Sequence, residues 1–233
     1  MILSRREFLA AAAAPALFQS PAAPTAPVQP LGTREALKLG DDRDGFVYIP
    51  KGYVKGTAMP LLFMLHGAGN TSLSVQYSLP LADEFGVIIL APDSRDERTW
   101  DGVLRHWGPD VDFMASALEQ TMGRYTVDAA HLGVGGFSDG ASYALSFGIS
   151  YGDQFTRVIS MSPGVMQPIA ARGKPKIFLS HGTSDPIMPI DATSRVFAPK
   201  LKSLGYDVTY REYEGRHAPS PPVVREAFEW FMH

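Results

Sequence analysis

The sequence predicts an α/β fold in which helices cover both faces of a mostly parallel central sheet. Short apolar runs alternate with segments of helical periodicity from about residue 33 onward, as in strands joined by crossover helices. Several of these runs are apolar throughout, which is typical of parallel strands buried on both faces. The 233 residues, 45% hydrophobic and 19% charged, suit one domain with its own core.

Each expected strand is a short run rich in aliphatic or aromatic residues. Pro60–Leu65 and Gly86–Asp93 are the most continuous, and the run at 131–137 leads into a glycine-rich turn. The expected strands in chain order are 46–49, 60–65, 86–93, 131–137, 158–161, 176–180 and 208–211.

The expected helices lie between or after these strands. In residues 109–125 the apolar side chains recur at steps of four and three, which places them on one helical face. Further helical stretches lie near 140–151, 191–204 and 220–232. Because strands and helices alternate, successive strands are expected to pair in parallel. No internal repeat, second domain or large cap domain is expected.

Residues 1–22 are expected to direct export rather than to join the fold. Arg5 and Arg6 precede an apolar run from Phe8 to Phe18, the order of regions in a secretory signal. The segment resembles a twin-arginine export signal, with cleavage expected near Ala22. The run is too short to cross a bilayer, which takes about 20 apolar residues, so no stable membrane anchor is expected. The alternative is a disordered basic N-terminus.

Cleavage there leaves a flexible Pro/Ala-rich segment at 23–40 and a single folded domain at 41–233. The mature protein is expected in the periplasm or outside the cell, with the export machinery as a partner during translocation. The chain has no cysteine, which excludes disulfides, thiolate zinc sites and a cysteine nucleophile. A net charge of −3 gives no basic surplus, so nucleic-acid binding is not expected.

One serine lies where a nucleophile is expected. Gly136-Phe137-Ser138-Asp139-Gly140 follows an expected strand and precedes an expected helix. Sites in parallel sheets form at the carboxyl ends of strands, and small residues around Ser138 allow the tight turn that exposes a nucleophilic hydroxyl. The alternative is an ordinary glycine-rich connection with a capping serine.

A serine hydroxyl needs a base that removes its proton and an acid that orients this base. His217 follows the last expected strand, and Asp185 follows the strand at 176–180. The chain order serine, acid, histidine matches a known hydrolase arrangement. Asp191 is the alternative acid, but its position favours an N-cap of the next helix.

The oxyanion of a tetrahedral intermediate needs two hydrogen-bond donors. One is expected from the N–H of Asp139, the residue after the nucleophile. The other is expected from Ala68, where small residues follow an early buried strand and let the backbone approach a substrate. The alternative is a plain glycine turn. No metal or other cofactor is expected.

Together these motifs resemble those of the α/β-hydrolases, and more narrowly the phospholipase/carboxylesterase-like esterases. The resemblance covers the chain from about residue 45 to its end. It implies the α/β-hydrolase fold, a catalytic domain without a large cap, and a Ser138–His217–Asp185 triad that works without a metal. The matching segments are 65–69, 91–95, 136–142, 181–185 and 215–217.

The segment from Ser94 to Gly108 is long for a connection after a strand, and such length often marks a functional loop. Trp100 and Trp107 within it are expected to wall an apolar substrate pocket. Further candidate walls are Ile187 and Met188 after the expected acid, and residues 162–166 after another strand. The alternative is that both tryptophans pin the loop to the body of the protein.

The sequence therefore predicts a serine esterase that cleaves carboxylic esters of small molecules through an acyl-enzyme. The same triad also fits a peptidase, an acyltransferase, or a polyester or feruloyl-ester hydrolase. The absence of cysteines and of an added binding module counts against a polymer substrate. A non-catalytic binding module that kept the fold is the remaining alternative.

Overall fold

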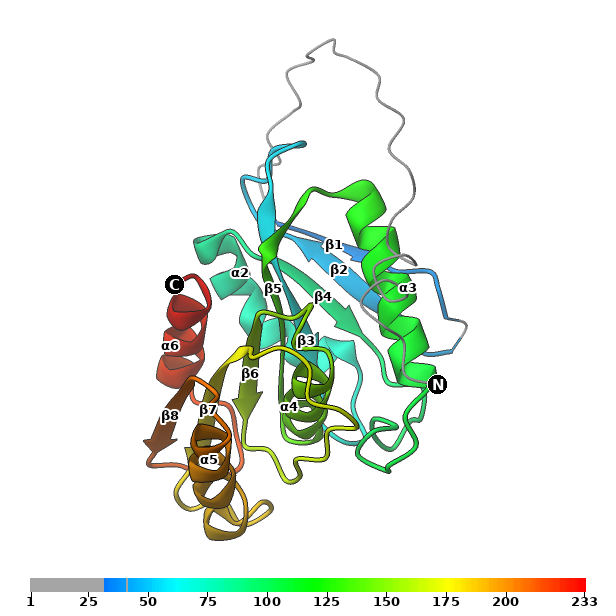
Figure 1. Cartoon of the computed structure of the whole chain (residues 1–233). Helices are drawn as coiled ribbons and strands as arrows, with labels where there is room; N and C mark the ends of the chain where they lie inside the picture. Colours follow the sequence, from blue (N-terminus) through cyan, green and yellow to red (C-terminus); the bar gives the residue numbers. More distant parts are fainter. Residues whose placement is uncertain (1–31, 41) are drawn as a thin grey trace.

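The computed structural model describes residues 32–40 and 42–233, drawn in colour in Figure 1; the expected signal at 1–22 lies outside the described residues. The strands of the described residues are β1 (Thr33–Ala36), β2 (Gly45–Ile49), β3 (Met59–Leu65), β4 (Ile88–Pro92), β5 (Val127–Phe137), β6 (Arg157–Met161), β7 (Lys176–Gly182) and β8 (Val208–Tyr213). They form one eight-stranded sheet in the order β1-β2-β4-β3-β5-β6-β7-β8. β1 and β2 pair antiparallel with their neighbours, and β3 to β8 pair in parallel.

Helices cover both faces of this sheet, as the sequence predicts (Figure 1). The helical elements are η1 (Ser72–Ser78), α2 (Leu79–Phe85), α3 (Pro109–Arg124), α4 (Asp139–Ser150), η2 (Ile190–Ala192), α5 (Ser194–Ser203) and α6 (Pro221–Phe231). α3, α4 and α5 pack on one face, whereas η1, α2 and α6 pack on the other. The sheet therefore separates two hydrophobic cores.

Alternating side chains of β3 divide between the two cores. Leu61, Phe63 and Leu65 belong to the core beneath α3, α4 and α5, whereas Leu62 and Met64 belong to the core beneath α2 and α6. All of them are at most 1% exposed, as the period of two in a doubly buried strand requires. Burial of each such side chain stabilises the fold by about 1.5–3 kcal/mol. The carboxyl end of β3 is thus a rigid base for the loop that follows.

Serines spaced four apart fix α4 in place. Ser142, Ser146 and Ser150 each donate a hydroxyl hydrogen bond to the backbone carbonyl four residues earlier. The same oxygens accept backbone N–H groups from the β6–β7 connection, those of Gly164, Gln167 and Ile169. Because buried polar groups are costly when unpaired, this pairing holds the connection against the helix that begins next to Ser138.

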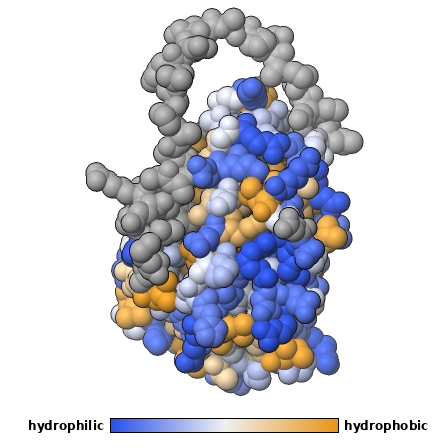
Figure 2. Space-filling view, turned by 90° about the vertical axis from the view of Figure 1, so that its right-hand side faces the viewer, coloured by the Kyte–Doolittle hydropathy of each residue, from blue (hydrophilic) through white to orange (hydrophobic). Residues whose placement is uncertain are grey.

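The surface on the α3 side is mostly hydrophilic, with hydrophobic residues in separate areas (Figure 2). This matches the amphipathic spacing predicted for 109–125, whose apolar face lies against the sheet. Among the described residues, no helix combines the length and apolar character needed to span a bilayer.

The sheet begins earlier than the sequence predicts. Residues 33–36, expected to belong to a flexible segment at 23–40, form β1 and pair with β2, so the folded domain starts before residue 41. The side chains of β1 alternate only between half-buried and exposed, which leaves no apolar run to indicate a strand. η1 and α2 were also not predicted: polar residues interrupt any helical period in 72–78, and α2, with only 7 residues, is too short to show one.

Candidate active site

Ser138 lies in the tight turn between β5 and α4. Its backbone has φ 59° and ψ −122°, a left-handed φ that is uncommon for a residue with a side chain. The neighbouring glycines permit this turn: a Cβ on Gly136 would lie 2.5 Å from the backbone of Gly140, and one on Gly140 would lie 2.2 Å from the Leu65 carbonyl oxygen. The turn carries the serine hydroxyl to the carboxyl edge of the sheet, as predicted.

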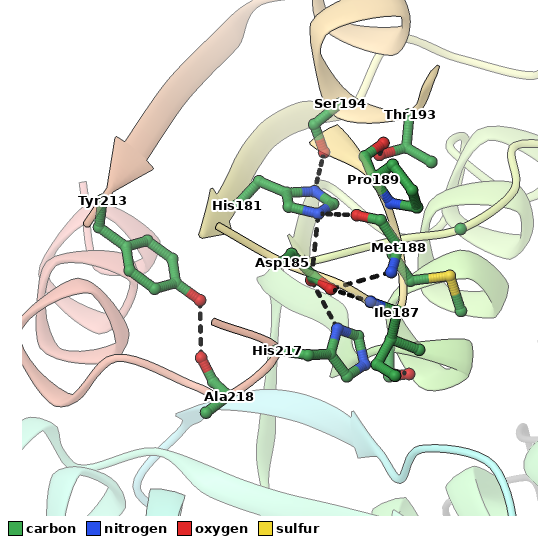
Figure 3. Close-up of polar contacts among 12 residues, drawn as sticks. His181, Asp185, Ile187, Met188, Pro189, Thr193, Ser194, Tyr213, His217 and Ala218 are labelled. Carbon is green, nitrogen blue, oxygen red and sulfur yellow. Dashed lines mark hydrogen bonds and ion pairs between the residues drawn. The ribbon is translucent and has the colours of Figure 1, made fainter. Parts of the chain in front are cut away.

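The structure brings Ser138, His217 and Asp185 into one hydrogen-bonded chain. The Ser138 hydroxyl lies 2.8 Å from Nε2 of His217, and Nδ1 of His217 lies 2.6 Å from Oδ2 of Asp185 (Figure 3 shows the second contact). The three residues come from the β5–α4 turn, the segment after β8 and the segment after β7. Phe137 packs against the imidazole, with ring centroids 4.7 Å apart, and so helps to orient it.

Asp185 is buried but well supplied with donors. Its Oδ1 accepts the N–H groups of Ile187 and Met188, both at 2.9 Å. Burial by itself raises the pKa of Asp185, but the N–H donors and His217 together lower it below the usual range. A carboxylate that stays ionised can hold the Nδ1–H of His217 and leave Nε2 facing the serine.

His181 supports this carboxylate from behind. It is fully buried at the end of β7, and burial lowers its pKa, which favours the neutral imidazole. Nε2 lies 2.7 Å from the Met188 carbonyl and 3.3 Å from Oδ2 of Asp185, while Nδ1 lies 2.7 Å from the Ser194 hydroxyl (Figure 3). These partners assign the proton to Nε2, so His181 ties the segment carrying Asp185 to the start of α5.

Both expected oxyanion donors lie close to Ser138. Asp139 is the first residue of α4, so its N–H has no acceptor inside the helix. Ala68 follows Gly67, where an added Cβ would lie 3.4 Å from the Cβ of Ser138. Within the described part of the chain, neither N–H donates a hydrogen bond to another protein group. Both are therefore available to a developing negative charge.

The Ser94–Gly108 loop supports the oxyanion loop instead of forming the pocket. The Arg98 carbonyl accepts the N–H of Gly69 at 2.7 Å, and the Thr99 hydroxyl donates to the carboxylate of Asp139 at 2.5 Å. Arg43 reaches across from the β1–β2 connection and donates to the Asn70 carbonyl at 2.8 Å. The loop after β3 is thus held from several sides.

The expected role of Trp100 and Trp107 as pocket walls is wrong. Trp100 is 0% exposed, and its Nε1–H donates to the His66 carbonyl at 2.8 Å. Its ring lies between His66 and Tyr143, with centroids 4.8 and 5.2 Å away, and Trp107 stacks on the same tyrosine at 5.0 Å. Both indoles hold the loop against the body of the protein, as the alternative interpretation predicts. His66 adds to this brace, since its Nε2 accepts the Ser94 N–H at 3.0 Å.

A cavity of about 460 Å³ opens at Ser138. Met188 was expected to wall it but does not: its backbone holds Asp185, and its sulfur lies next to Gly164, whose added Cβ would be 2.4 Å away. The neighbouring Ile187, 63% exposed, lines it as expected, whereas residues 162–166 do not. The apolar side chains of the lining are Leu65, Val75, Tyr77, Phe137, Ile187 and Pro219.

Of these six side chains only Ile187 was expected as a wall; Tyr77 and Pro219 are two of the five that were not. Pro219 follows His217 by two residues, so its proximity in the chain was an available signal. Tyr77 lies in η1, for which no element was predicted.

Asp191, the alternative acid, lies apart from the triad in η2, where it pairs with Arg195 at 2.8 Å. It is not the N-cap of α5. In the described chain, no group of three or more His, Asp or Glu residues is arranged to hold a metal.

Known proteins share this fold and parts of this sequence. An acyl-protein thioesterase 1 of Gibberella zeae is 27% identical over 108 residues, which are 42% of this chain and 46% of that protein. A probable feruloyl esterase C of Aspergillus niger is 27% identical over 158 residues, 64% of this chain and 57% of that protein. The matches thus span only about half the length of these relatives.

Solved structures and a family comparison extend these similarities. The crystal structure of esterase PE8 superposes with a TM-score of 0.66 at 24% identity, covering 81% of this chain and 97% of that one, which shows the shared fold. Residues 113–231, just over half of the chain, match the family described as phospholipase/carboxylesterase. With the parallel sheet and the nucleophile turn already described, this match establishes that the chain belongs to the phospholipase/carboxylesterase family of α/β-hydrolases.

Proposed function

We propose that this protein is a serine hydrolase that cleaves carboxylic esters. One observation carries the proposal: the Ser138 hydroxyl lies 2.8 Å from an imidazole that a buried carboxylate holds on its other side at 2.6 Å. A serine is a weak nucleophile without such a base, and a base is poorly oriented without such an acid. Two unengaged N–H groups beside the hydroxyl complete the set that acyl transfer requires.

Acylation begins when His217 accepts the Ser138 proton and the serine oxygen attacks the ester carbonyl carbon. The carbonyl oxygen becomes an oxyanion, which the N–H groups of Ala68 and Asp139 stabilise. The new imidazolium is stabilised by Asp185 and gives its proton to the ester oxygen as the carbon–oxygen bond breaks. The alcohol leaves, and the acyl group remains on Ser138.

Deacylation repeats these steps with water. His217 takes a proton from water as the hydroxide oxygen attacks the acyl carbon, and the same N–H groups hold the second oxyanion. Collapse returns the proton to Ser138 and releases the carboxylic acid. Because His217 carries every proton of this cycle and no step uses a metal, EDTA should leave turnover unchanged.

Carboxylic esters are favoured over amides as substrates. The relatives are named as a thioesterase and a feruloyl esterase, and esters and thioesters both lose a good leaving group from an acyl carbon. The apolar cavity at Ser138 suits an uncharged ester. Amides have a poorer leaving group, because the histidine must protonate the amide nitrogen before the carbon–nitrogen bond can break. Peptide cleavage is therefore the second candidate function, which the following assay separates.

The test compares hydrolysis of p-nitrophenyl acetate with that of a p-nitroanilide of the same acyl group. We expect ester turnover by the wild type with little amide cleavage, and a loss of at least ~10³-fold in kcat for Ser138→Ala. Ser203→Ala makes the same change at the exposed end of α5 and serves as the matched control. Strong anilide cleavage with negligible ester turnover would instead indicate a peptidase.

We also propose that residues 1–22 direct export of the enzyme through a twin-arginine route. The support is the adjacent pair Arg5 and Arg6 followed by a short apolar run. Replacing both arginines with lysine should retain the protein in the cytoplasmic fraction of the producing cell. If the variant fractionates with the wild type outside the cytoplasm, the proposed route is wrong.

A further inference from the structure

A second cavity adjoins the one at Ser138. It measures about 640 Å³ and shares two walls, Tyr77 and Pro219, with the cavity that contains the serine. Its remaining walls come from α2 and α6, which pack together on the same face of the sheet (Figure 1). We name it the α2–α6 groove; its lining is Tyr77, Leu81, Pro219, Pro221, Pro222, Val224 and Arg225.

The groove is lined mainly by apolar side chains. Pro221 and Pro222 open α6, and neither has an N–H, so this helix N-terminus lacks donors that usually bind an anion. Arg225 is the charged residue in the lining, but its guanidinium is already paired with Glu84 at 2.9 Å and Glu229 at 3.1 Å. The walls therefore suit a neutral apolar group, not a carboxylate or phosphate.

Tyr77 forms the boundary between the two cavities. Its hydroxyl is buried and makes no hydrogen bond to any described residue. The Tyr77 side chain lines both cavities, and no hydrogen bond to a described residue fixes its polar end in place. Pro219, the other residue that lines both cavities, has a fixed φ and no N–H. The two residues that both cavities share therefore present ring carbon, and Pro219 adds no backbone donor.

The position of Pro219 indicates which half of an ester enters the groove. In the proposed mechanism, His217 gives its proton to the leaving oxygen, so the alcohol side of the ester lies next to Nε2 of that imidazole. Pro219 follows His217 by two residues and lines both cavities. A chain attached to the leaving oxygen thus meets the entrance of the groove first.

We propose that the α2–α6 groove is a subsite for the alcohol half of the substrate, and that it binds an elongated alkyl or aryl group. The enzyme then prefers esters of long or aromatic alcohols to esters of methanol. This inference rests on the proposed ester hydrolase function. It also assigns the selection to acylation, because the alcohol has left before deacylation begins. The preference should therefore be seen in kcat/KM, which reports the steps up to the acyl-enzyme.

The test uses methyl, butyl and hexyl acetate, which share one acyl group, with release of acetic acid as the readout. In the wild type we expect kcat/KM to rise at least ~10-fold from methyl to hexyl acetate. Pro222→Trp places a large ring in the groove at an exposed position, and should lower the hexyl-to-methyl ratio by about 10-fold. Leu81→Trp obstructs the opposite wall and should act in the same direction.

Val196→Trp is the matched control, since Val196 is 49% exposed on α5, on the other face of the sheet. It should leave the hexyl-to-methyl ratio at the wild-type value. Labelling of Ser138 by a fluorophosphonate probe, measured for each variant, reports separately whether the triad is intact. A parallel series of p-nitrophenyl acetate, butyrate and octanoate lengthens the acyl half instead.

Ester turnover with no dependence on alcohol length would overturn the inference but leave the proposed function standing. The inference would also be wrong if Pro222→Trp changed the acyl series and not the alcohol series, since the groove would then hold the acyl chain. Absence of both ester turnover and Ser138 labelling in the wild type would contradict the proposed function itself.

Discussion

A buried carboxylate at the start of α3 makes stability depend on pH in an unusual direction. Asp110 is 0% exposed and accepts the N–H of Arg95 at 2.5 Å and that of Asp101 at 2.6 Å. It therefore holds both arms of the Ser94–Gly108 loop. Burial, which outweighs these donors, raises the pKa of Asp110 to about 6 from the ordinary 3.8. The helix dipole lowers the pKa by an amount worth only about 0.3–1 kcal/mol.

The direction of this pH dependence follows from the protons that the folded and unfolded states bind. Between pH 3.8 and about 6 the folded state keeps the Asp110 proton and the unfolded state does not, so this group's contribution to stability falls as pH rises. The gap between the two pKa values corresponds to about 3 kcal/mol in total. Roughly 2 kcal/mol of it is lost between pH 4.5 and pH 7.

Urea unfolding of the wild type and Asp110→Asn at pH 4.5, 5.5 and 7 measures this contribution together with its coupling to the neighbouring Asp101, because the remaining titrating groups are common to both proteins. The free energy of unfolding of the wild type minus that of the variant should fall by about 2 kcal/mol from pH 4.5 to pH 7. Asp112→Asn removes the same charge at an exposed position of the same helical turn and controls for net charge. A difference that stays flat or grows with pH refutes the reasoning, since the hydrogen bonds would then outweigh burial.

Two more substitutions test the hydrogen bonds that hold the active site in place. Ser142→Ala leaves the Gly164 N–H without its 2.8 Å acceptor and should cost about 1–3 kcal/mol, lowering Tm by several degrees in calorimetry; an unchanged Tm would mean that water replaces the hydroxyl. His181→Phe removes the donor behind Asp185 and should lower kcat about 10- to 100-fold with KM little changed; full activity would show that the N–H groups of Ile187 and Met188 hold the carboxylate alone.

The parallel core and the arrangement of Ser138, Asp185 and His217 were predictable because each depends on local signals. Continuous apolar runs indicate doubly buried strands, and chain order then places residues that follow those strands at one edge of the sheet. The glycines around Ser138 act through close backbone contacts, which the spacing in the sequence already reflects. These features need no knowledge of how distant side chains pack.

The pocket could not be predicted in the same way. Trp100 is a large aromatic residue of the kind that often walls a pocket, yet its ring packs between His66 and Tyr143. Nothing in the local sequence indicates that contact. Tyr77 reaches the site from a segment without helical periodicity. β1 is held by pairing with β2 and not by an apolar run of its own. In each case the position of the residue depends on its tertiary contacts, which the local sequence pattern does not indicate.

The central claim is that Ser138 is the nucleophile activated by His217 and Asp185. Reaction with a fluorophosphonate probe, followed by digestion and mass spectrometry of the peptides, tests it most directly. We predict one adduct, on Ser138, that is absent in Ser138→Ala and forms far more slowly in His217→Ala. An adduct on another serine, or equal labelling of Ser138→Ala, would contradict it.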